Sequence, residues 1–571
     1  MYELAGANRF KVRAYENGAE ALLGFTGDLE DAVRTGRLRE VPGIGDTIFG
    51  NVRELVTTGR LRLYDELRAS FPRGLSECLR IPGLGAAKLR ALYDSLGVDS
   101  LEALEHACRE GRIANVRGFG QKSAEHLLRG IAMVRASSGF FLHSGAGERA
   151  RELVSFLAAS GLADAVSAAG SVRRLREVVR NVDIVASSTS PAKLAEAFRA
   201  FPEVVDVVAA GESLSTVRFL DGLTADLRVV PPDAFAAALV CFTGSGAHTS
   251  ALRARAKARG LRLDAQGLLD GRGRPRPAES ERDVYAALGL AYVEPELREG
   301  DGEIEAAEQG RLPRLIGRDA LRGLFHVHTD ASDGRDSLET MVRATHEAGY
   351  AYVAITDHSQ SAGYAGGLTM DRMRAQAQEI RELRRRLPGI RILHGTEADI
   401  LADGSIDYGD EFLAELDFVV ASVHSRFRLT REEQTARLIR AVRNPRVAVL
   451  GHPTGRLLLS REGVTADMDA VIDAAAESGC ALEVNASPHR MDLDWRLVRK
   501  CVDRGVMLAI DPDAHSTREL DYVPYGLAMA RKGWAEPGCV LNARDADGVV
   551  AWLERRRGGP IPEARQGSSA G

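Results

Sequence analysis

From about Leu321 onwards, short apolar runs alternate with helical segments along the chain. Apolar strands of this kind, separated by helices, are typical of a parallel sheet that is buried on both faces. Seven such units in succession predict a barrel of alternating strands and helices. The strand-like runs are GLFHVH, YVAITDH, IRILHGTE, FVVASVHS, VAVLGHP, ALEVNAS and VMLAIDPDAH.

The first half of the chain has two other patterns. Residues 1–137 suggest short helices joined by glycine-containing turns, and the turns VPGIG, IPGLG and VRGFG form a weak internal repeat. Residues 140–230 alternate apolar runs such as VDIVAS and ADLRVV with helical stretches, which predicts an α/β unit. Residues 236–305 are mixed, and 299–320 are polar enough to serve as a linker.

Composition narrows the class of protein. A chain of 571 residues suggests three or more domains. Its net charge of -5 argues against a uniformly basic nucleic-acid binder, although local patches still permit nucleic-acid contact. The six cysteines form no CxxC pair, so neither a disulfide framework nor a thiolate zinc site is indicated. Since no signal core and no long apolar run is present, we expect a cytoplasmic protein without a membrane segment.

Histidines are concentrated in the C-terminal half. The chain has 13 histidines, and those that follow a strand-like run are of most interest, because that end of the strands builds the active site in parallel barrels. One such histidine alone would more often be a satisfied core or surface residue, but a matching series is not explained in that way. The series comprises His326, His328, His358, His394, His424, His452 and His515, whereas His346 and His489 lie in other settings.

Carboxylates are interleaved with these histidines. His326 and His328 form an HxH pair that shares one face of a strand. Asp333 follows in an SDG turn, Glu397 follows the third run, and Asp513 precedes His515 by two positions. Imidazole combined with carboxylate suits Zn, Mn or Fe, and closely spaced ions can clamp a phosphate and activate water. We therefore expect a metal-dependent phosphoesterase.

The three glycine turns suggest a second chemistry. Each PxGxG-like turn opens a helix, and its glycines allow the N–H groups at the helix start to hold a DNA phosphate without sequence preference. Glycine turns end many helices, so one match means little, but three favour DNA binding. The glycines concerned are Gly43, Gly45, Gly83, Gly85, Gly118 and Gly120.

The segment AGSVRRLREVVRNVDIVAS suits nucleotidyl transfer. Gly170 and Ser171 would cradle a triphosphate, while Asp183, with Asp226 on a neighbouring strand, would hold Mg²⁺. For either aspartate taken alone, a solvated strand residue is the simpler interpretation.

The C-terminal motifs HVHTDASDG, ITDHS, GTEADI, SVHS, GHPTGR, LEVNASP and DAHS resemble those of the PHP (polymerase and histidinol phosphatase) family. The resemblance implies a distorted (β/α)7 barrel with up to three ions, which we expect to be Mn²⁺, or else Zn²⁺ or Fe²⁺. His394 is not among the ligands that the resemblance implies, so we expect it to support a ligand or to have a structural role. Arg456 and Arg490 are expected either to bind a phosphate or to form surface salt bridges. The implied ligands are His326, His328, Asp333, His358, Glu397, His424, His452, Asp513 and His515.

The N-terminal half is similar to the DNA polymerase X family through NRFKVRAYENGA, VPGIG, IPGLG, GSVRR, FTGSGAH and YVEPELREGDGEIEAA. Combined with a PHP domain, this matches the bacterial and archaeal form, a gap-filling repair polymerase with a 3′–5′ exonuclease. The resemblance implies a monomer that acts on gapped or nicked DNA or on 3′ ends, with dNTP and Mg²⁺ or Mn²⁺ at the polymerase site. The implied catalytic residues are Asp183, Asp226 and Asn181, and the nucleotide-binding residues are Gly170, Ser171, Arg174, Gly244 and Ser245.

The same resemblance implies a multidomain organisation. An α-helical helix-hairpin-helix region is followed by an α/β nucleotidyltransferase palm, a thumb and the PHP barrel. The expected boundaries are 1–72 and 73–137 for two helix-hairpin-helix domains, 138–235 for the palm, 236–305 for the thumb, 306–320 for a linker, 321–557 for the PHP domain and 558–571 for a disordered tail.

Three departures from the family pattern fall on polymerase and lyase chemistry. Asn181 replaces one of the two aspartates of a DxD motif, and Asn51 replaces a Schiff-base lysine. Thr249 and the Cys241–Phe242 pair replace residues that normally touch the nucleotide. We therefore expect an intact nuclease and a weakened or lost polymerase. A metabolic phosphatase of the histidinol phosphate kind and a non-catalytic DNA-end-binding scaffold are the competing hypotheses.

Overall fold

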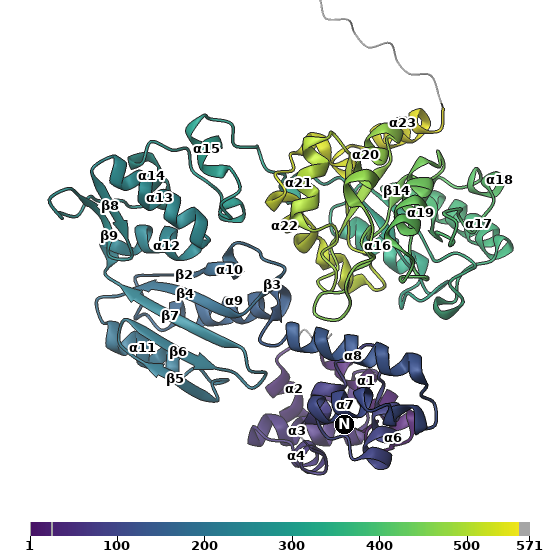
Figure 1. Ribbon diagram of the computed structural model, residues 1–571, viewed down its shortest axis with the longest axis horizontal. Coiled ribbons are helices and arrows are strands. Elements are labelled where there is room, and N and C mark those ends of the chain that lie inside the picture. Colours follow the sequence, from purple (N-terminus) through teal and green to yellow (C-terminus); the bar gives the residue numbers. More distant parts are fainter. Residues whose placement is uncertain (1, 24, 26, 73, 559–571) are drawn as a thin grey trace, which may run out of the picture. The chain divides into compact units, whose positions relative to one another are not determined.

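The computed structural model describes residues 2–558 apart from 24, 26 and 73 (Figure 1). It separates into two compact units, of which the first contains the chain up to Ser138 and the second contains most of the remainder. The expectation of a disordered tail at 558–571 falls, apart from Gly558, outside the described residues. None of the described helices combines the length and the apolar character needed to cross a membrane.

The first unit is helical, as its sequence pattern predicts. One core forms around Leu38, Ile44 and Phe49, and a second core forms around Leu89 and Leu104. Short helical turns precede each glycine turn, and a full helix follows it. The helices are α1 (Arg9–Leu23), α2 (Leu29–Thr35), α3 (Asp46–Thr58), α4 (Arg62–Ala69), α5 (Gly74–Cys78), α6 (Ala86–Leu96), α7 (Leu101–Arg109) and α8 (Gln121–Ala136).

The second unit begins with a five-stranded mixed sheet of order β2-β4-β7-β6-β5, in which β4 and β7 are parallel. Alternate residues of β4 face opposite sides. Ile184 packs with α9 (His143–Ala159) and α11 (Pro191–Arg199), whereas Val185 packs with α12 (Phe235–Thr243) on the other face. The strands are β2 (Ala165–Ala169), β4 (Asn181–Ser187), β5 (Asp206–Ala210), β6 (Leu214–Arg218) and β7 (Thr224–Val230), next to a short pair β1 (Phe141–Leu142) and β3 (Val178–Val179).

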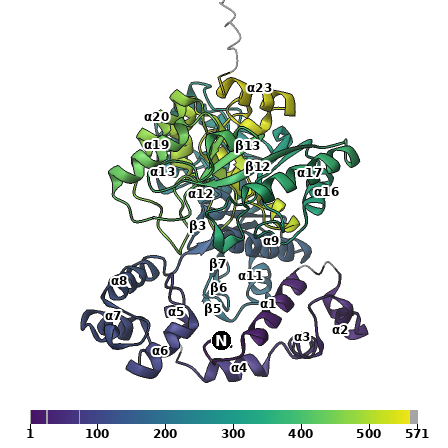
Figure 2. The ribbon, with the colours of Figure 1, turned by 90° about the vertical axis from the view of Figure 1, so that its right-hand side faces the viewer.

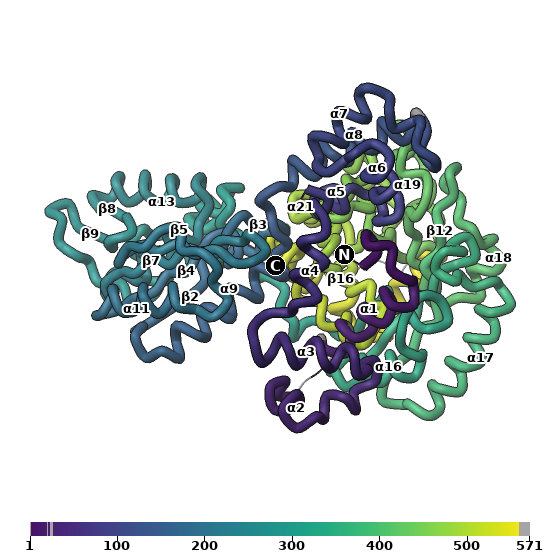
Figure 3. Tube along the Cα trace, turned by 90° about the horizontal axis from the view of Figure 1, so that it is seen from below, coloured from purple at the N-terminus to yellow at the C-terminus, as the bar shows by residue number. Residues whose placement is uncertain are grey.

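A small helical region follows the sheet, and Figure 3 shows its elements beside the sheet strands. Its interior contains ionic pairs that are protected from water. Arg298 is buried and its Nη1 lies 2.6 Å from Glu281 Oε1, while His248 Nδ1 lies 2.5 Å from Glu303 Oε1. The elements are α12, α13 (Gly246–Ala258), β8 (Leu261–Asp264), β9 (Gly267–Asp270), α14 (Glu281–Ala287) and α15 (Glu303–Glu308).

The polar segment 299–320 is packed rather than extended. Glu303 is buried and also accepts a hydrogen bond of 2.9 Å from the Gly300 amide. Ile316 is buried in the core of the following barrel, and its amide donates to the Ala535 carbonyl at 3.0 Å. The segment therefore combines exposed charged residues with two buried anchor points, Glu303 and Ile316.

The C-terminal region is a seven-stranded sheet in which every strand is parallel to its neighbours, in the order β10 to β16. A parallel bridge between Val327 and Ala514 joins the first strand to the segment after the last, which closes the predicted barrel. The strands are β10 (Gly323–Val327), β11 (Tyr352–Ile355), β12 (Arg391–Asp399), β13 (Phe418–Ser422), β14 (Val449–Leu450), β15 (Ala481–Asn485) and β16 (Leu508–Asp511).

Helices surround these strands, as Figure 2 shows for α16, α17, α19 and α20 around β12 and β13. Inside the barrel Phe325 stacks on Phe418 with ring centroids 4.3 Å apart, and Trp552 of the last helix belongs to the same cluster. One end of the barrel is thus filled with apolar side chains. The helices are α16 (Leu338–Glu347), α17 (Met370–Arg386), α18 (Asp410–Leu413), α19 (Arg431–Arg443), α20 (Met468–Ser478), α21 (Trp495–Asp503), α22 (Val523–Lys532) and α23 (Ala546–Arg556).

One buried lysine joins the barrel to the preceding domains of the second unit. Lys532, at the end of α22, donates from Nζ to the carbonyl oxygens of Arg174 at 2.9 Å and Glu296 at 3.2 Å. It also lies 2.7 Å from Glu299 Oε1. A buried ammonium needs such partners, because an unpaired charge in a protein interior is costly.

Candidate metal centre and nucleic-acid sites

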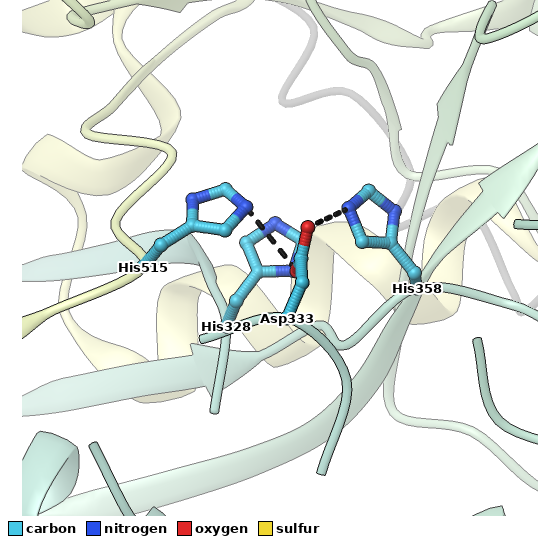
Figure 4. Close-up of side chains that lie close together, drawn as sticks. All are labelled: His328, Asp333, His358 and His515. Carbon is cyan, nitrogen blue, oxygen red and sulfur yellow. Dashed lines mark ion pairs between the residues drawn. The ribbon is translucent and has the colours of Figure 1, made fainter. Parts of the chain in front are cut away.

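The carboxyl ends of the barrel strands bring together a dense cluster of metal-ligating side chains. Within the described residues, four overlapping groups have ligand atoms no more than 4.8 Å apart. Figure 4 shows one group, in which the Asp333 carboxylate lies between His358 and His515, with His328 beside it. The four groups together contain His326, His328, Asp333, His358, Glu397, His424, His452, Asp513 and His515, which are all nine residues predicted as ligands.

A bulge in β10 brings the HxH pair into the site. The register with β11 shifts between Leu324 and Val327, and His326 takes a left-handed backbone with φ of 54°. A bulge places two successive side chains on one face of a strand. Phe325 thus fills the barrel interior while His326 and His328 face the centre and Val327 packs outward against the helices.

Positive φ angles recur among the clustered residues, with 24° at His452 and 53° at Asp513. Residues other than glycine seldom adopt this region, and such strain concentrates at functional sites. The surrounding barrel therefore holds these side chains in place at a conformational cost.

Glu397 lies at the middle of the cluster and is almost fully buried. Its Oε1 is 2.9 Å from His452 Nε2, 3.1 Å from His424 Nε2 and 3.2 Å from His326 Nε2. Its Oε2 is 2.9 Å from His358 Nδ1. A carboxylate with two oxygens directed to different imidazole sets is suited to bridging two ions.

Several of these buried atoms have no hydrogen-bond partner among the described residues. They include both ring nitrogens of His328, Nε2 of His326, Nδ1 of His358 and Oε2 of Glu397. Leaving a buried polar atom unpaired costs about 1–3 kcal/mol. Although His358 Nδ1 is close to Glu397 Oε2, the two are not aligned for a hydrogen bond. The donor set therefore fits divalent cations better than it fits a protein hydrogen-bond network.

A surrounding shell orients the imidazoles. His326 Nδ1 lies 2.5 Å from Glu483 Oε1, and His424 Nδ1 lies 2.7 Å from Asp399 Oδ1. His515 Nδ1 contacts the Asp513 carbonyl at 2.9 Å. When one ring nitrogen donates in this way, the other presents its lone pair to the centre.

Sequence reasoning did not assign Glu483 or Asp399 a role, although both lie inside the motifs LEVNASP and GTEADI. Asp399 is two positions after Glu397 on β12, so the period of the strand contained a signal for it. Glu483 lies on β15, 157 positions from His326, and only the fold reveals their contact.

The pKa values of the clustered histidines depend on two opposing effects, burial and the charge of neighbouring side chains. Burial lowers the pKa of His358, but Glu397 and Asp333 outweigh it and raise the value to about 10. The same competition raises the pKa of His424 to about 9 through Glu397 and Asp399. His328 is different, because burial and the neighbouring His515 and His358 lower its pKa to about 3. Cation binding would therefore displace protons from some imidazoles and find others already neutral.

Three other residues considered from the sequence lie differently. His394 is within β12 rather than at a strand end, so the expectation that it follows a strand is wrong. It occupies the opposite strand face from Glu397 and belongs to none of the metal groups. Arg456 bonds to the Arg490 carbonyl and to Asp494, so it supports a loop. Arg490 Nε lies 3.5 Å from Asp513 Oδ2, at the edge of the centre.

The polymerase-like site lies on the five-stranded sheet. Asp183 on β4 and Asp226 on β7 are direct partners in the parallel register. Asn181 Nδ2 donates to Asp183 Oδ1 at 3.2 Å and to Asp226 Oδ2 at 2.8 Å, and Thr216 Oγ1 donates to Asp226 Oδ1 at 2.5 Å. Burial and then the charge of Asp226 raise the pKa of Asp183. The amide thus occupies the position between two carboxylates that a cation would share.

The Gly-Ser turn lies against the same carboxylate. Gly170 has φ of 59°, and a Cβ atom there would lie 2.0 Å from Asp183 Oδ2. The turn Gly170–Arg173 forms a single helical turn (α10), so Ser171 lies in it beside the sheet edge. Glycine is required here for two reasons, its backbone conformation and the close approach of the carboxylate.

The remaining predicted nucleotide-binding residues lie where this region meets the next one. Arg174 Nη1 donates to the Thr243 carbonyl at 2.7 Å, and its Nε pairs with Glu299 at 3.1 Å. Gly244 ends α12, and the Ser245 side chain caps α13 by accepting from the His248 amide. Arg174 is therefore already paired in this structure.

The three glycine turns have one shared geometry. The first glycine of each turn has a left-handed backbone, with φ of 94° at Gly43, 76° at Gly83 and 91° at Gly118. The second glycine is the N-cap of the next helix: Gly45 for α3, Gly85 for α6 and Gly120 for α8. Because glycine has no side chain, the N-cap residue offers no side-chain acceptor to the first N–H groups of each helix. That arrangement suits an anion such as a phosphate.

The other departures from the family pattern take part in local hydrogen bonds. Asn51 donates from Nδ2 to the Tyr15 hydroxyl at 2.8 Å, in place of an amine. Thr249 is buried and donates to the Cys241 carbonyl at 3.3 Å. Neither side chain supplies the nucleophile or the nucleotide contact that the family pattern expects.

Comparison with protein families agrees with this organisation. A helix-hairpin-helix domain matches residues 1–61, and a SAM-like helix-hairpin-helix tandem matches 75–132. A DNA polymerase beta thumb matches 238–299, and a PHP domain matches 325–487.

Curated relatives fall into two groups. The chain is 37% identical over 556 residues to the "DNA polymerase/3'-5' exonuclease PolX" of Bacillus subtilis, which covers 97% of both proteins. Its C-terminal part is 29% identical over 256 residues to a "Probable phosphatase" of Caldanaerobacter subterraneus, covering 43% of this chain and 96% of that protein. A similar match of 28% over 241 residues involves a "Probable phosphatase" of Shewanella sediminis. Because the first similarity extends over nearly the whole of both chains, the protein belongs to the PolX family of DNA polymerase/3′–5′ exonucleases.

Proposed function

We propose that this chain is a DNA-repair enzyme whose PHP barrel is a metal-dependent 3′–5′ exonuclease and whose middle domains form an X-family polymerase core. The observation that supports it best is the combination, in one chain, of nine clustered His, Asp and Glu side chains with three glycine turns of shared geometry. A small-molecule phosphatase needs the cluster but has no use for the turns.

The metal at the barrel is proposed to be Mn²⁺, with Zn²⁺ or Fe²⁺ as alternatives, in up to three positions. The cluster contains six imidazoles and three carboxylates. Imidazoles favour these ions over Mg²⁺, which prefers oxygen ligands and retains its water. Such ions supply Lewis acidity and an activated water for attack on a phosphodiester.

The chain's own residues would hold and orient the ions and the substrate. Glu483 and Asp399 fix which nitrogen of His326 and His424 faces the centre. Arg490 lies at the edge of the site, where its guanidinium can meet a phosphate oxygen after leaving Asp513. Burial of Glu397 strengthens every charge interaction in the centre, because the effective dielectric constant there is low.

For the polymerase site we propose weakened activity with Mg²⁺ or Mn²⁺ and dNTP. Asp183 and Asp226 would ligate the ions, with Asn181 as a neutral third ligand, and Gly170, Ser171, Gly244 and Ser245 would line the nucleotide site. Arg174 would take part only after leaving Glu299. An amide oxygen can ligate a cation but contributes no negative charge, so binding of two divalent ions should be weaker.

The proposed substrate is gapped or nicked DNA or a 3′ end, bound without sequence preference through Gly43, Gly45, Gly83, Gly85, Gly118 and Gly120. We propose a cytoplasmic monomer with helix-hairpin-helix domains at 1–72 and 73–137, a palm at 138–235, a thumb at 236–305, a connecting segment at 306–320 and the PHP domain at 321–557. The compact first unit, which ends at Ser138, is consistent with the second of these boundaries.

The phosphatase relatives support one competing function, hydrolysis of small phosphate monoesters. The two hypotheses are separated by an assay on a 5′-labelled primer in gapped DNA, with Mn²⁺, Mg²⁺ or chelator, and with or without dNTPs. Shortening of the primer in Mn²⁺ supports the exonuclease, and extension in the presence of dNTPs supports the polymerase. Activity on p-nitrophenyl phosphate without either change in the primer would contradict the proposal and favour the phosphatase.

A further inference from the structure

An exposed aromatic ring lies beside the metal centre, and the proposed mechanism does not use it. Tyr364 is on a short helical turn, Gly363–Ala365, in the loop that follows His358. Its exposed fraction is 73%, whereas those of its neighbours Ala362 and Ala365 are 0% and 3%. The loop is therefore anchored on both sides of a ring that faces solvent.

The ring lies close to two members of the metal cluster. Its centroid is 6.2 Å from that of His358 and 6.4 Å from that of His424. The interplanar angles of 58° and 75° show that Tyr364 stacks on neither imidazole. One face of the phenol ring can thus receive a flat group that also reaches the centre.

The loop that carries Tyr364 is fixed by several backbone contacts. The Leu368 amide donates to the His358 carbonyl at 2.8 Å, and Ser359 and Leu368 form a parallel bridge. A Cβ atom at Gly367 would lie 2.0 Å from the Ser359 carbonyl oxygen, so the two ends of the loop cross closely. The Tyr408 hydroxyl also donates to the Leu368 carbonyl. These contacts fix the ends of the loop, and thereby the place from which the Tyr364 side chain starts.

We propose that Tyr364 stacks against the base of the 3′-terminal nucleotide while the adjoining phosphodiester lies at the metal centre. The inference rests on the proposed exonuclease function and adds a substrate-positioning residue to it. Every base has an aromatic face, so stacking positions single-stranded ends without selecting a sequence. The nearness of the ring to His358 and His424 allows one nucleoside to span from the phosphate to the base.

A purely structural role would have a different signature. If Tyr364 only shielded the centre from water, its loss would slow hydrolysis of all substrates equally. If it stacks, its loss removes the advantage of a substrate that has a terminal base. The comparison of substrates with and without that base therefore separates the two roles.

The test compares Tyr364→Phe, which retains the ring, with Tyr364→Ala, which removes it. Each is assayed in the full chain with Mn²⁺ on single-stranded DNA that ends in thymidine or in an abasic tetrahydrofuran nucleotide. The wild-type protein and Tyr364→Phe should release the thymidine nucleotide roughly five-fold or more faster than the abasic one at limiting substrate. Tyr364→Ala should release the two at similar rates. A base preference that persists in Tyr364→Ala would overturn the inference.

A second measurement does not depend on turnover. The 3′-terminal base is replaced by 2-aminopurine, joined through a non-hydrolysable methylenephosphonate, and its fluorescence is followed in Mn²⁺. Stacking predicts quenching by the wild-type protein and by Tyr364→Phe but not by Tyr364→Ala, and equal quenching by all three would contradict it. Wild-type protein that quenches the fluorophore but releases no nucleotide from the hydrolysable thymidine-ended strand would instead contradict the exonuclease proposal alone.

Discussion

The Asn181 side-chain amide donates a hydrogen bond of 2.8 Å to Asp226 Oδ2, where the family pattern has a third carboxylate. Asn181→Asp should therefore raise primer extension in Mg²⁺, on the order of 10–100-fold, because a charged ligand binds the ions more tightly than a neutral amide does. The measurement is extension of a labelled primer across a gap over a range of Mg²⁺ concentrations. Asn181→Ala is the matched control and should give no gain. Equal extension by the wild-type protein and Asn181→Asp would contradict this interpretation of the site.

The close approach of Gly170 to the Asp183 carboxylate in the polymerase-like site predicts a steric effect on stability. Gly170→Ala should destabilise the protein by about 1–3 kcal/mol more than Gly161→Ala, because the new methyl group meets the Asp183 carboxylate. Gly161 has a similar φ of 67° and, in the described part of the chain, nothing within 4 Å of its Cβ position, so it controls for backbone strain. Urea denaturation monitored by circular dichroism measures the difference. Equal urea midpoints for the two variants would contradict this prediction, because they would show that the turn accommodates the extra methyl group without strain.

Removal of a ligand should abolish nuclease activity without unfolding the barrel. His328 belongs to two of the metal groups and Asp513 to one of them. We therefore expect His328→Ala and Asp513→Ala to lose bound Mn²⁺ and to release nucleotides at least a hundred-fold more slowly. His346 is an exposed histidine on α16 of the same barrel. The control variant His346→Ala should therefore keep both its bound Mn²⁺ and its nucleotide release. Metal content by mass spectrometry and release from a 5′-labelled strand are the measurements. Undiminished release in both ligand variants would eliminate the assignment.

DNA binding by the glycine turns can be tested at a helix N-cap. Gly85 has φ of −69°, and a Cβ there has nothing within 4 Å among the described residues, so larger side chains fit. Gly85→Asp should stabilise α6 as a cap yet weaken DNA binding, because a carboxylate would occupy the position of a phosphate. Gly85→Asn is the neutral control and should retain more affinity. Binding of fluorescent gapped DNA should also weaken as salt rises. A Gly85→Asp variant that binds as tightly as Gly85→Asn would argue against phosphate contact there.

A buried histidine outside the metal centre predicts a pH effect on stability. Burial lowers the pKa of His143 to about 4, below its unfolded value of about 6.5. Above pH 6.5 the His143 imidazole is neutral in both the folded and the unfolded protein. Below pH 6.5 it gains a proton in the unfolded protein first, so the free energy of unfolding falls until about pH 4. The expected loss attributable to His143 is about 2 kcal/mol at pH 5. Thermal unfolding at pH 7 and pH 5 should show a smaller pH effect for His143→Gln than for the wild-type protein. Equal effects in the two proteins would contradict this origin.

The strand-end histidines were predictable because parallel strands direct their carboxyl ends to one side of a barrel, whatever their separation along the chain. The family and the barrel are confirmed, and the nine expected residues do lie together. The bulge at His326 was not predictable, because it depends on a local register shift against β11. His394 was misplaced because β12 continues to Asp399, beyond the apolar run that suggested its end.

Side-chain contacts between residues that lie far apart in the sequence could not be predicted from sequence patterns. Arg174 was assigned to the nucleotide by its place after a Gly-Ser turn, but Glu299, which pairs with it, is 125 positions away. Likewise the composition of the polar segment 299–320 could not reveal that Glu303 is buried against His248 and that Ile316 docks on the barrel. Composition reports which groups are charged, whereas only the fold determines which of them meet.

The buried ammonium of Lys532 has a consequence for how the two activities can be separated. Cutting the chain before the barrel would leave Glu299 and the carbonyls of Arg174 and Glu296 without their shared donor, beside the turn that carries the polymerase residues. A truncated polymerase fragment would therefore be expected to lose nucleotide affinity for reasons unrelated to the nuclease. The two activities can therefore be separated only by point substitutions within an intact chain. A relative that has lost the nuclease activity would be expected to keep the barrel, because the barrel supports the polymerase region.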